Sequence, residues 1–330
     1  MKKISMQNIA DELGISKVTV YRALKDKYGV SEEMKLHIEN YAKSVGYDIS
    51  HKNAKRIKHL VFVIARPFYF DGEEFYHSIF AQLQKACQAA NQEIKVYKIS
   101  QKDDDLLKIP DSIVQGKIDG IFLGQGLSAA YINALQQYNL PTVALDFDFN
   151  GDSILIDNYA LGRSATELLI KNGHRTIGFV GDPKTDQNIL DRFFGYRRAL
   201  FNADIDFLPE WQTSNNDIKT ELYSINFPLP TPLPTAFICY CDCAAYYLIE
   251  RLKIEKKRIP EEVSIISFDN TSLASKTTPN LTSINVDRTD FANQALFVLM
   301  QRAANPKMNF QTIYMRGTII ERDSLKNLEV

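Results

Sequence analysis

Residues 1–46 read MKKISMQNIADELGISKVTVYRALKDKYGVSEEMKLHIENYAKSVG and predict three short helices with a tight turn between the first two. Apolar residues share one face of a helix from Met6 to Leu13, which Ser5 caps and Gly14 ends. A second helix is expected from Lys17 to Leu24. This layout is typical of a helix-turn-helix DNA-binding domain. Three amphipathic helices in a segment of this length fit a protein-binding module equally well.

The second and third helices would complete a small core. Ser16 can cap the second helix, in which Val20 and Leu24 would face inward. The third helix opens at Ser31 and carries apolar residues that would close the bundle. These residues are Leu36, Ile38, Tyr41, Ala42 and Val45.

The outward side of the second helix is where contacts with DNA bases are expected, because a recognition helix presents its exposed side chains to the major groove. The residues expected at base edges are Lys17, Val18 and Arg22. Residues at helix starts and flanks are expected at phosphates. They are Ser5, Ser16, Thr19, Tyr21 and Ser31.

Positive charge is concentrated at the amino end, as phosphate neutralisation requires. Residues 1–59 hold 12 Lys and Arg against 7 Asp and Glu, whereas the whole chain has a net charge of −1. The segment HKNAKRIKH at 51–59 carries four Lys and Arg and no acid. Directly after a helix-turn-helix it is expected to lie along DNA phosphates, whereas by itself it would pass for a solvated linker. Its cationic contacts would come from Lys52, Lys55, Arg56 and Lys58.

Length and composition indicate an intracellular protein with more than one domain. The chain has 330 residues and 45% hydrophobic content, which is about twice the usual length of a single domain. No secretory signal pattern and no 18-residue apolar run occurs. Four cysteines, at Cys87, Cys239, Cys241 and Cys243, do not form a disulfide framework. We expect a cytoplasmic, nucleoid-associated protein.

From Leu60 onward, apolar runs alternate with helical stretches, which predicts doubly wound α/β architecture. The runs are continuous in Val, Ile, Leu and Phe, as parallel strands covered on both faces must be. They read LVFVI, EIKVYKI, GIFLG, PTVALDF, TIGFVG, AFICY and VSIISF. The helix candidates read EEFYHSIFAQLQKACQAAN, LSAAYINALQQYN, NYALGRSATELLIKNG and NQALFVLMQRAAN.

Polar and aromatic side chains follow several of these strands, where open α/β sheets bind their ligands. Carboxylates that accept paired hydroxyl donors, together with aromatic rings, suit a polyhydroxylated ligand such as a sugar. Strand-end aspartates that merely cap the next helix would give the same pattern. The candidates for effector binding are Phe68, Tyr69, Phe70, Asp71, Gln125, Asp146, Asp242 and Asp269.

Several stretches of the sequence resemble the lactose-repressor (LacI/GalR) family of bacterial transcription regulators. ISMQNIADELGISKVTVYRAL is similar to the opening of that family, and VSEEMKLHIENYAKSVGY is similar to its third helix and exit. Further phrases follow in the family's order and approximate spacing over nearly the whole chain. They read DNYALG, KNGHRTIGFVGDP, DRFFGYRRAL, PEW, PTAFICYCD, IPEEVSIISFDN and PNLTSINVDR.

The resemblance implies a fold in three parts. A helix-turn-helix domain at 1–47 and a basic hinge at 48–59 would precede an effector-binding and dimerisation domain at 60–330. That last domain would resemble periplasmic sugar-binding proteins, with two subdomains and the ligand between them. The subdomains would comprise about 60–157 plus 288–317 and about 158–286 plus 318–330. The chain would cross between them near Ile156–Tyr159, Asn285–Arg288 and Arg316–Thr318.

The resemblance also assigns roles to individual residues. Arg192 matches the arginine with which the family holds its effector, and Asp269 matches its usual partner in the cleft. Asp242 matches the aspartate of an Asn-Asp pair, with Cys241 in place of the Asn, and Asp146 matches a cleft residue. The family often has a ligand-stacking aromatic residue shortly after PEW. Here that stretch reads QTSNNDIKT, so the residues that contact a ligand on this wall of the cleft are left unassigned.

The hinge is shorter than the resemblance leads one to expect. Family members have about sixteen residues before the first strand, including a leucine that wedges into the minor groove. This chain has only DISHKNAKRIKH, which contains no Leu. Either Ile57 is the wedge, or the hinge contacts DNA only through its cationic side chains. The second alternative is favoured.

The sequence therefore predicts a DNA-binding repressor of sugar-utilisation genes that acts as a homodimer on a pseudo-palindromic operator. Its alternatives are a regulator of the same fold that senses a nucleobase or a phosphoprotein, and a sugar-binding transport protein or hydrolase. We expect no catalytic residues, no metal, no cofactor and no membrane contact. Dimer contacts are expected from FYHSIFAQLQKACQAA and from CAAYYLIERL. In the second stretch, Tyr246, Tyr247 and Leu248 are more large side chains than one buried helix face needs.

Overall fold

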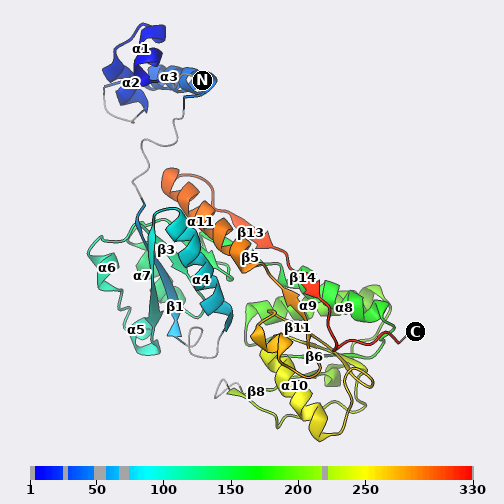
Figure 1. Cartoon of the computed structure of the whole chain (residues 1–330). Coiled ribbons are helices and arrows are strands. Elements are labelled where there is room, and N and C mark those ends of the chain that lie inside the picture. The colour runs from blue at the N-terminus through cyan, green and yellow to red at the C-terminus, as the bar shows by residue number, and fades with distance from the viewer. Residues whose placement is uncertain (1–3, 25–28, 48–56, 67–73, 218–221, 329–330) are drawn as a thin grey trace.

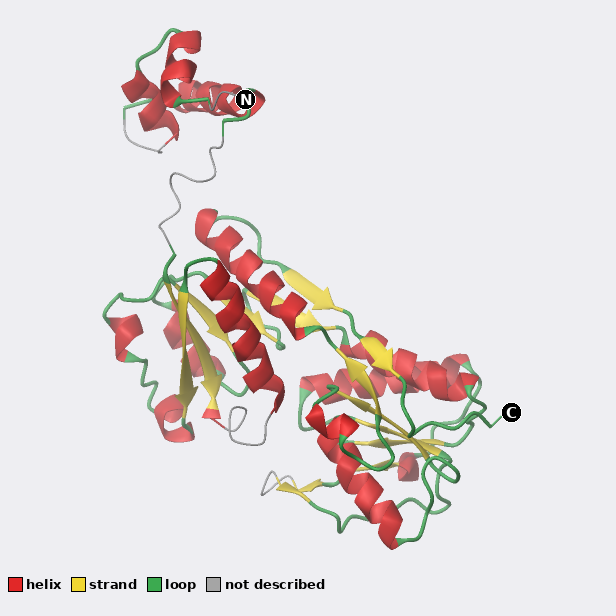
Figure 2. Cartoon of the chain, viewed as in Figure 1, coloured by secondary structure: helices red, strands yellow, loops and turns green. Residues whose placement is uncertain are grey.

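A computed structural model describes residues 4–24, 29–47, 57–66, 74–217 and 222–328. It contains a bundle of three helices and a larger α/β part with two six-stranded sheets (Figures 1 and 2). None of the helices in the described ranges combines the length and the apolar character of a membrane-spanning segment.

The three-helix bundle comprises α1 (Met6–Leu13), α2 (Lys17–Leu24) and α3 (Glu32–Ser44). The side chain of Ser5 caps α1 in a capping box with Asn8, and Gly14 ends the helix at a φ of 64°. The Oγ of Ser16 accepts a hydrogen bond from the N–H of Thr19 at 3.0 Å and so caps α2. The core contains Ile9, Ala10, Val20, Ala23, Leu24, Ile38, Ala42 and Tyr47.

One residue expected in that core lies outside it. Leu36 is 61% exposed, whereas Ile38 is fully buried. The two residues are only two positions apart on α3, so they point about 200° apart around the helix axis and cannot share its buried face.

The first α/β subdomain is built on the sheet order β13-β5-β4-β3-β1-β2, in which all neighbours are parallel. Helices α4 and α11 pack together beside this sheet. Its strands are β1 (His59–Ala65), β2 (Glu93–Ile99), β3 (Gly120–Leu123), β4 (Thr142–Leu145), β5 (Asp152–Ile156) and β13 (Thr312–Met315). Its helices are α4 (Glu74–Ala89), α5 (Gln101–Asp105), α6 (Asp111–Val114), α7 (Ala129–Gln136) and α11 (Arg288–Ala304).

The second subdomain has the sheet order β14-β12-β11-β10-β6-β7, parallel except for the antiparallel pair of β12 and β14. Its strands are β6 (Ile177–Val180), β7 (Gln212–Thr213), β10 (Ala236–Cys239), β11 (Ser264–Phe268), β12 (Thr282–Asn285) and β14 (Thr318–Ile320). Its helices are α8 (Asn158–Lys171), α9 (Gln187–Asn202), η2 (Pro209–Trp211), α10 (Asp242–Ile254) and η3 (Ser272–Ser275). Strands β8 (Asn216–Asp217) and β9 (Leu222–Tyr223) pair separately.

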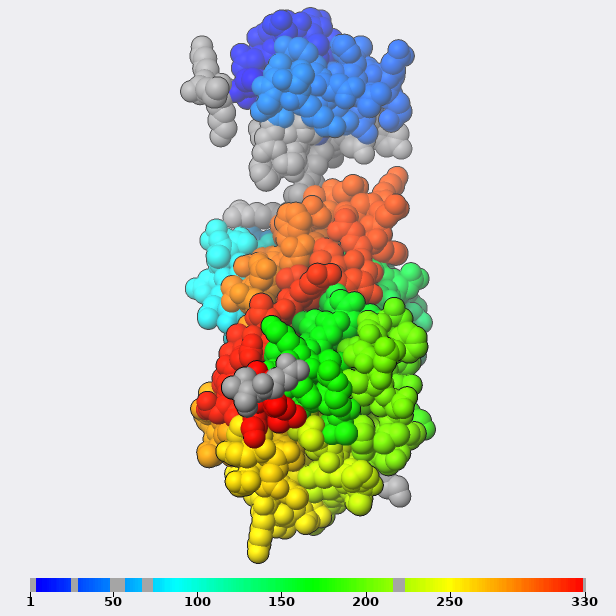
Figure 3. Space-filling model, turned by 90° about the vertical axis from the view of Figure 1, so that its right-hand side faces the viewer, coloured from blue at the N-terminus to red at the C-terminus, as the bar shows by residue number. Residues whose placement is uncertain are grey.

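The chain passes between the subdomains three times: from β5 to α8, from β12 to α11, and from β13 to β14. The predicted doubly wound α/β architecture is confirmed. In Figure 3, α11 (orange) lies on the surface of the first subdomain, and α8 and α9 (green) lie on the surface of the second.

A buried ion pair joins α11 to the sheet of the first subdomain. Arg302 donates to both carboxylate oxygens of Asp152, with Nε–Oδ2 and Nη2–Oδ1 distances of 2.7 and 2.9 Å. The same guanidinium donates to the carbonyls of Pro306, Met308 and Asn309 in the turn toward β13. These groups are withdrawn from water. Removing one partner therefore leaves the desolvation of the others uncompensated by hydrogen bonds or by an opposite charge.

Arg302→Ala should therefore lower the free energy of unfolding by about 3–5 kcal/mol, because it leaves the Asp152 carboxylate buried without a cation, with only the N–H of Gln311 as a donor. Urea unfolding followed by circular dichroism measures the loss. Arg163→Ala is the matched control, since Arg163 forms an exposed 3.4 Å pair with Glu167, and it should cost less than about 1 kcal/mol. Equal losses for the two variants would contradict a structural role for the buried pair.

Candidate functional site

Polar side chains from both subdomains meet at one junction, beyond the carboxyl ends of the strands. Asn188, at the start of α9, donates from Nδ2 to Oδ2 of Asp146, which follows β4, at 2.9 Å. Ser272 donates from its N–H and its hydroxyl to the carboxylate of Glu74 on α4, at 2.7 and 2.5 Å. These contacts across the two sheets define what we call the junction.

Arg192 of α9 is buried at the junction with its donors engaged. Its Nε donates to Oδ1 of Asn158 at 2.8 Å, and Nη1 donates to the carbonyl of Tyr240. Its Nη2 lies 3.6 Å from Oδ1 of Asp269, and the guanidinium lies 4.5 Å from the centre of the Phe268 ring. Desolvated cations need such partners, so the position of this side chain is fixed from several elements at once.

Asp146 lies at the centre of the junction and is 4% exposed. Its φ of 65° turns the chain out of β4, and its carbonyl accepts a hydrogen bond from Nε2 of Gln125 at 2.7 Å. Oδ2 also accepts from the hydroxyl of Tyr76 at 3.3 Å, but the buried Oδ1 has no partner. Burial raises the pKa of Asp146 to about 7, against the opposing effect of Arg192.

Asp269 follows β11 and faces the same arginine. Burial raises the pKa of its carboxyl to about 6, while Arg192 acts to lower it. Its φ of 94° and the hydrogen bond from Arg288 to its carbonyl fix the backbone here. Two of the carboxylates predicted from the sequence, Asp146 and Asp269, are thus both brought within electrostatic range of Arg192.

The structure contradicts the expected effector contact of Asp242. This side chain is 1% exposed, and its two oxygens accept four hydrogen bonds from protein groups. The donors are the hydroxyls of Ser267 and Ser283 and the N–H and hydroxyl of Thr271. Because a carboxylate has about four acceptor positions, Asp242 has none left for a ligand and instead ties β11, β12 and the loop before η3 together.

The link between Glu74 and Ser272 could not be found from the sequence, because 198 positions separate the two residues. Burial acts to raise the pKa of Glu74, but the hydrogen bonds from Ser272 and the nearby charges of Lys276 and Arg288 outweigh it, so the pKa lies below its usual range. The carboxylate is therefore ionised near neutral pH and accepts both hydrogen bonds from Ser272.

Three stacked tyrosines next to the junction were also missed. Tyr223 on β9 stacks between Tyr240 and Tyr247, with ring centres 6.4 and 5.5 Å away and interplanar angles of 14° and 15°. The hydroxyl of Tyr240 donates to that of Tyr223 at 2.8 Å. Tyr240 also provides the carbonyl that accepts a hydrogen bond from Arg192, so the stack is connected to the junction through the backbone of Tyr240. In the sequence, only Tyr240 in PTAFICYCD pointed to an aromatic residue near the end of this strand.

The remaining effector candidates divide into two groups. Gln125 is 9% exposed and bonded to the backbone of Asp146, so it supports that residue. The aromatic and acidic candidates after β1 lie outside the described residues. They are Phe68, Tyr69, Phe70 and Asp71.

Most of the DNA-contact candidates on the helical bundle are accessible. On α2, Lys17 and Arg22 are exposed, Val18 is 56% exposed and Tyr21 is 47% exposed. Thr19 is half-buried and its hydroxyl is hydrogen-bonded to that of Ser16. The three serines that cap the helices are also exposed. They are Ser5, Ser16 and Ser31.

The structure contradicts the role considered for Ile57. Its side chain is 6% exposed and belongs to the core cluster that contains β1, so it cannot wedge into the minor groove from this position. The sequence could not distinguish a hinge residue from the first core residue of the α/β part. Lys52, Lys55 and Arg56 lie outside the described residues.

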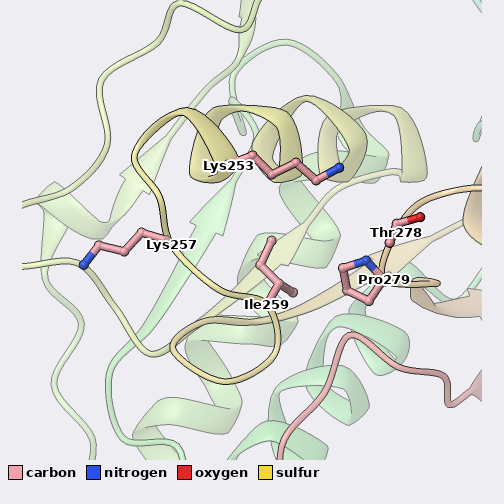
Figure 4. A pocket seen from close by; sticks show the side chains of 5 residues that line it. All are labelled: Lys253, Lys257, Ile259, Thr278 and Pro279. Carbon is pink, nitrogen blue, oxygen red and sulfur yellow. The ribbon is translucent and has the colours of Figure 1, made fainter.

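Two other features offer no comparable chemistry. Only Cys239 of the three nearby cysteines lies on a strand, and no cluster of three metal-ligating side chains occurs in the described ranges. A pocket of about 230 Å³ in the second subdomain is lined by Lys253, Lys257, Ile259, Thr278 and Pro279 (Figure 4). Both lysines lie close to glutamates, Glu250 and Glu262.

Comparisons with known proteins agree with this architecture. The family of periplasmic binding protein-like domains matches residues 166–325. The ribose operon repressor of Haemophilus influenzae is 26% identical over 98% of this chain and 99% of its own length. Among solved structures, the CelR–cellobiose complex is 19% identical, covers 97% of this chain and 99% of its own and has a TM-score of 0.69. The lac repressor dimer bound to operator is 16% identical, with coverages of 98% and 100% and a TM-score of 0.66.

The raised pKa of Asp146 predicts that the free energy of unfolding depends on pH. Between pH 4 and 7 the unfolded chain releases this proton while the folded protein keeps it, so the contribution of Asp146 to stability falls as the pH rises through this window. Asp146→Asn removes the titration. Its stability relative to the natural protein should therefore increase by about 2 kcal/mol between pH 5 and pH 8. Urea unfolding at both pH values tests this, and a difference independent of pH would contradict it.

Proposed function

Because this chain belongs to the LacI/GalR family of DNA-binding transcriptional repressors, we propose that it represses sugar-utilisation genes under the control of a sugar-like effector bound at the junction. The observation that carries the proposal is the convergence of Arg192, Asp146 and Asp269 from both subdomains. Buried charged groups beside stacked tyrosines suit hydroxyl groups and the apolar face of a sugar ring. We place its action in the cytoplasm, at the nucleoid.

The mechanism we propose is linkage between the junction and DNA. The hydrogen bonds from Asn188 to Asp146 and from Ser272 to Glu74 exist only in some relative orientations of the subdomains. An effector that binds one orientation more tightly shifts the population toward it. Since the helical bundles of a dimer are carried by these subdomains, the shift would change their fit to two operator half-sites.

For DNA recognition we propose the assignment of base contacts and phosphate contacts that was predicted from the sequence. The exposed side of α2 supports base contacts from Lys17, Val18 and Arg22. The N-termini of the three helices support phosphate contacts from Ser5, Ser16 and Ser31, with Thr19 and Tyr21 on the flanks. We retain residues 1–47 as the DNA-binding domain, followed by a basic hinge. The effector-binding and dimerisation domain begins at Ile57 rather than at 60, because Ile57 packs in its core and β1 starts at His59.

Arg22→Ala should weaken binding to the operator by about 1–3 kcal/mol and relax the preference at one base position, because a base-edge contact is lost. Fluorescence anisotropy with operator and random duplexes measures both effects. Arg258→Ala, which removes a 72% exposed arginine from the second subdomain, is the control and should change neither. An equal loss on both duplexes would reassign Arg22 to phosphate.

We also propose that the chain is a homodimer through its α/β part, with α4 and α10 at the interface. Tyr246 is 37% exposed and available, whereas Leu248 is fully buried in its own subdomain and cannot contribute as expected. Sedimentation at micromolar concentration should give a mass near twice 37.6 kDa. A stable monomer that binds one palindrome with full affinity would refute the dimer.

A further inference from the structure

The hydrogen bond between Asn188 and Asp146 joins the two subdomains through a buried carboxyl group. Nδ2 of Asn188, in the second subdomain, donates to Oδ2 of Asp146 at 2.9 Å, and the hydroxyl of Tyr76, in the first, donates to the same oxygen at 3.3 Å. We call the orientation in which this bond forms the closed orientation. We propose that closure takes up one proton from solvent, onto Oδ1 of Asp146, so that the subdomains close more readily in acid than in alkaline solution.

The first reason is the way in which the carboxyl group is enclosed. Asp146 is 4% exposed, and Nδ2 of Asn188 also lies 3.3 Å from its carbonyl oxygen, so α9 covers this residue from the second subdomain. Tyr76 and Gln125 cover it from the first. When the subdomains separate, Asn188 moves away and water reaches the carboxyl group. A group whose surroundings differ between two orientations couples its proton to the movement between them.

The second reason is the set of charges that faces the carboxyl group in the closed orientation. Arg192 and Asp186 face it from α9, and Asp269 faces it from the end of β11. One cation therefore stands against two carboxylates, and it already lies 3.6 Å from Asp269. The start of α9 offers little compensation, because Asp186 accepts hydrogen bonds from two of its N–H groups. A third negative charge is disfavoured here, whereas a neutral carboxyl group is tolerated.

The third reason is that Oδ1 of Asp146 is placed to hold the proton. Both donors contact Oδ2, whereas Oδ1 is buried with no donor among the described residues. Protonation of Oδ1 removes the buried charge and leaves Oδ2 as the acceptor of both hydrogen bonds. In agreement, burial raises the pKa of Asp146 to about 7 in the closed orientation, against about 3.9 for an aspartate in water.

The other contact between the subdomains does not titrate in this range. Burial acts to raise the pKa of Glu74, but the hydrogen bonds from Ser272 and the charges of Lys276 and Arg288 hold it below its usual range. Glu74 is therefore ionised above about pH 5 and keeps both hydrogen bonds from Ser272. The contribution of Asp146 to closure is complete below about pH 4 and is lost as the pH rises to about 7.

Single-molecule energy transfer between one dye on each subdomain of the full chain measures the closed fraction, without sugar or DNA. The dyes are attached to Leu106→Cys, after α5, and to Ile254→Cys, at the end of α10, since these side chains are 66% and 58% exposed. Cys243→Ser removes the native cysteine that is partly exposed, and the other three are buried. An excess of unlabelled protein keeps each dimer to one labelled chain.

We expect the ratio of closed to open molecules to fall by about 50-fold between pH 5 and pH 7, because one linked proton changes it by up to about 10-fold per pH unit. Asp146→Asn, whose amide is neutral at every pH, should reduce this change to about 3-fold or less. Asp148→Asn removes an exposed carboxylate two positions away and should leave the change as it is in the natural protein. Asp146→Ser also lacks the titrating group and takes the place of Asp146→Asn if that variant does not fold.

Three results would overturn the inference. They are a closed fraction that does not change between these pH values, a change of opposite sign, and the same change in the Asp146 variants. The last result would assign the proton to Asp269, where burial also raises the pKa, to about 6. Because the measurement contains neither sugar nor DNA, its failure would leave the proposed sugar-controlled repressor intact. Equally, a failure of sugar binding or of DNA control would leave the proton-linked closure standing.

Discussion

The buried guanidinium of Arg192 is the interaction on which the geometry of the second subdomain depends. It reaches its partners because α8 and α9 lie unusually close together: a Cβ on Gly162 would lie 2.2 Å from the carbonyl oxygen of Arg192, and one on Gly195 would lie 2.1 Å from that of Tyr159. Glycine is required at both positions. This close packing brings Asn158 to Arg192 and leaves the remaining donors of the arginine for the ends of β10 and β11.

The contacts between the subdomains at the junction have a different character. They include polar hydrogen bonds, such as those between Ser272 and Glu74, next to a core cluster that contains apolar residues of both subdomains. Hydrogen bonds of this kind contribute only about 0.5–1.5 kcal/mol each, more when charged, so a ligand with modest preference for one orientation can redistribute the population. A rigid second subdomain that meets the first through such contacts is well suited to report on a bound effector.

Local features were predictable from the sequence, whereas contacts between distant residues were not. The bounds of α1 and α2 follow from capping serines and helical periodicity, which act within a few residues. The strands at the sheet centres were predictable from their apolar runs. Strand β13, at a sheet edge, alternates in exposure and so has no continuous apolar run. Strands β8 and β9 have only two residues each, which is too short for such a pattern. Asp242 and Asp146 both follow a strand, and only tertiary structure shows that one carboxylate is saturated and the other is not.

The central claim is that a ligand at the junction controls the affinity of the helical bundles for DNA. The most direct test is the affinity of the natural protein for a duplex that it selects from random sequence, measured by fluorescence anisotropy at about 0.15 M salt with and without a saturating concentration of a sugar that it binds. We expect the selected duplex to bind about 1,000-fold or more tightly than random DNA, and the sugar to change that affinity by about 10-fold or more. An operator affinity that stays the same at saturating sugar would contradict the account.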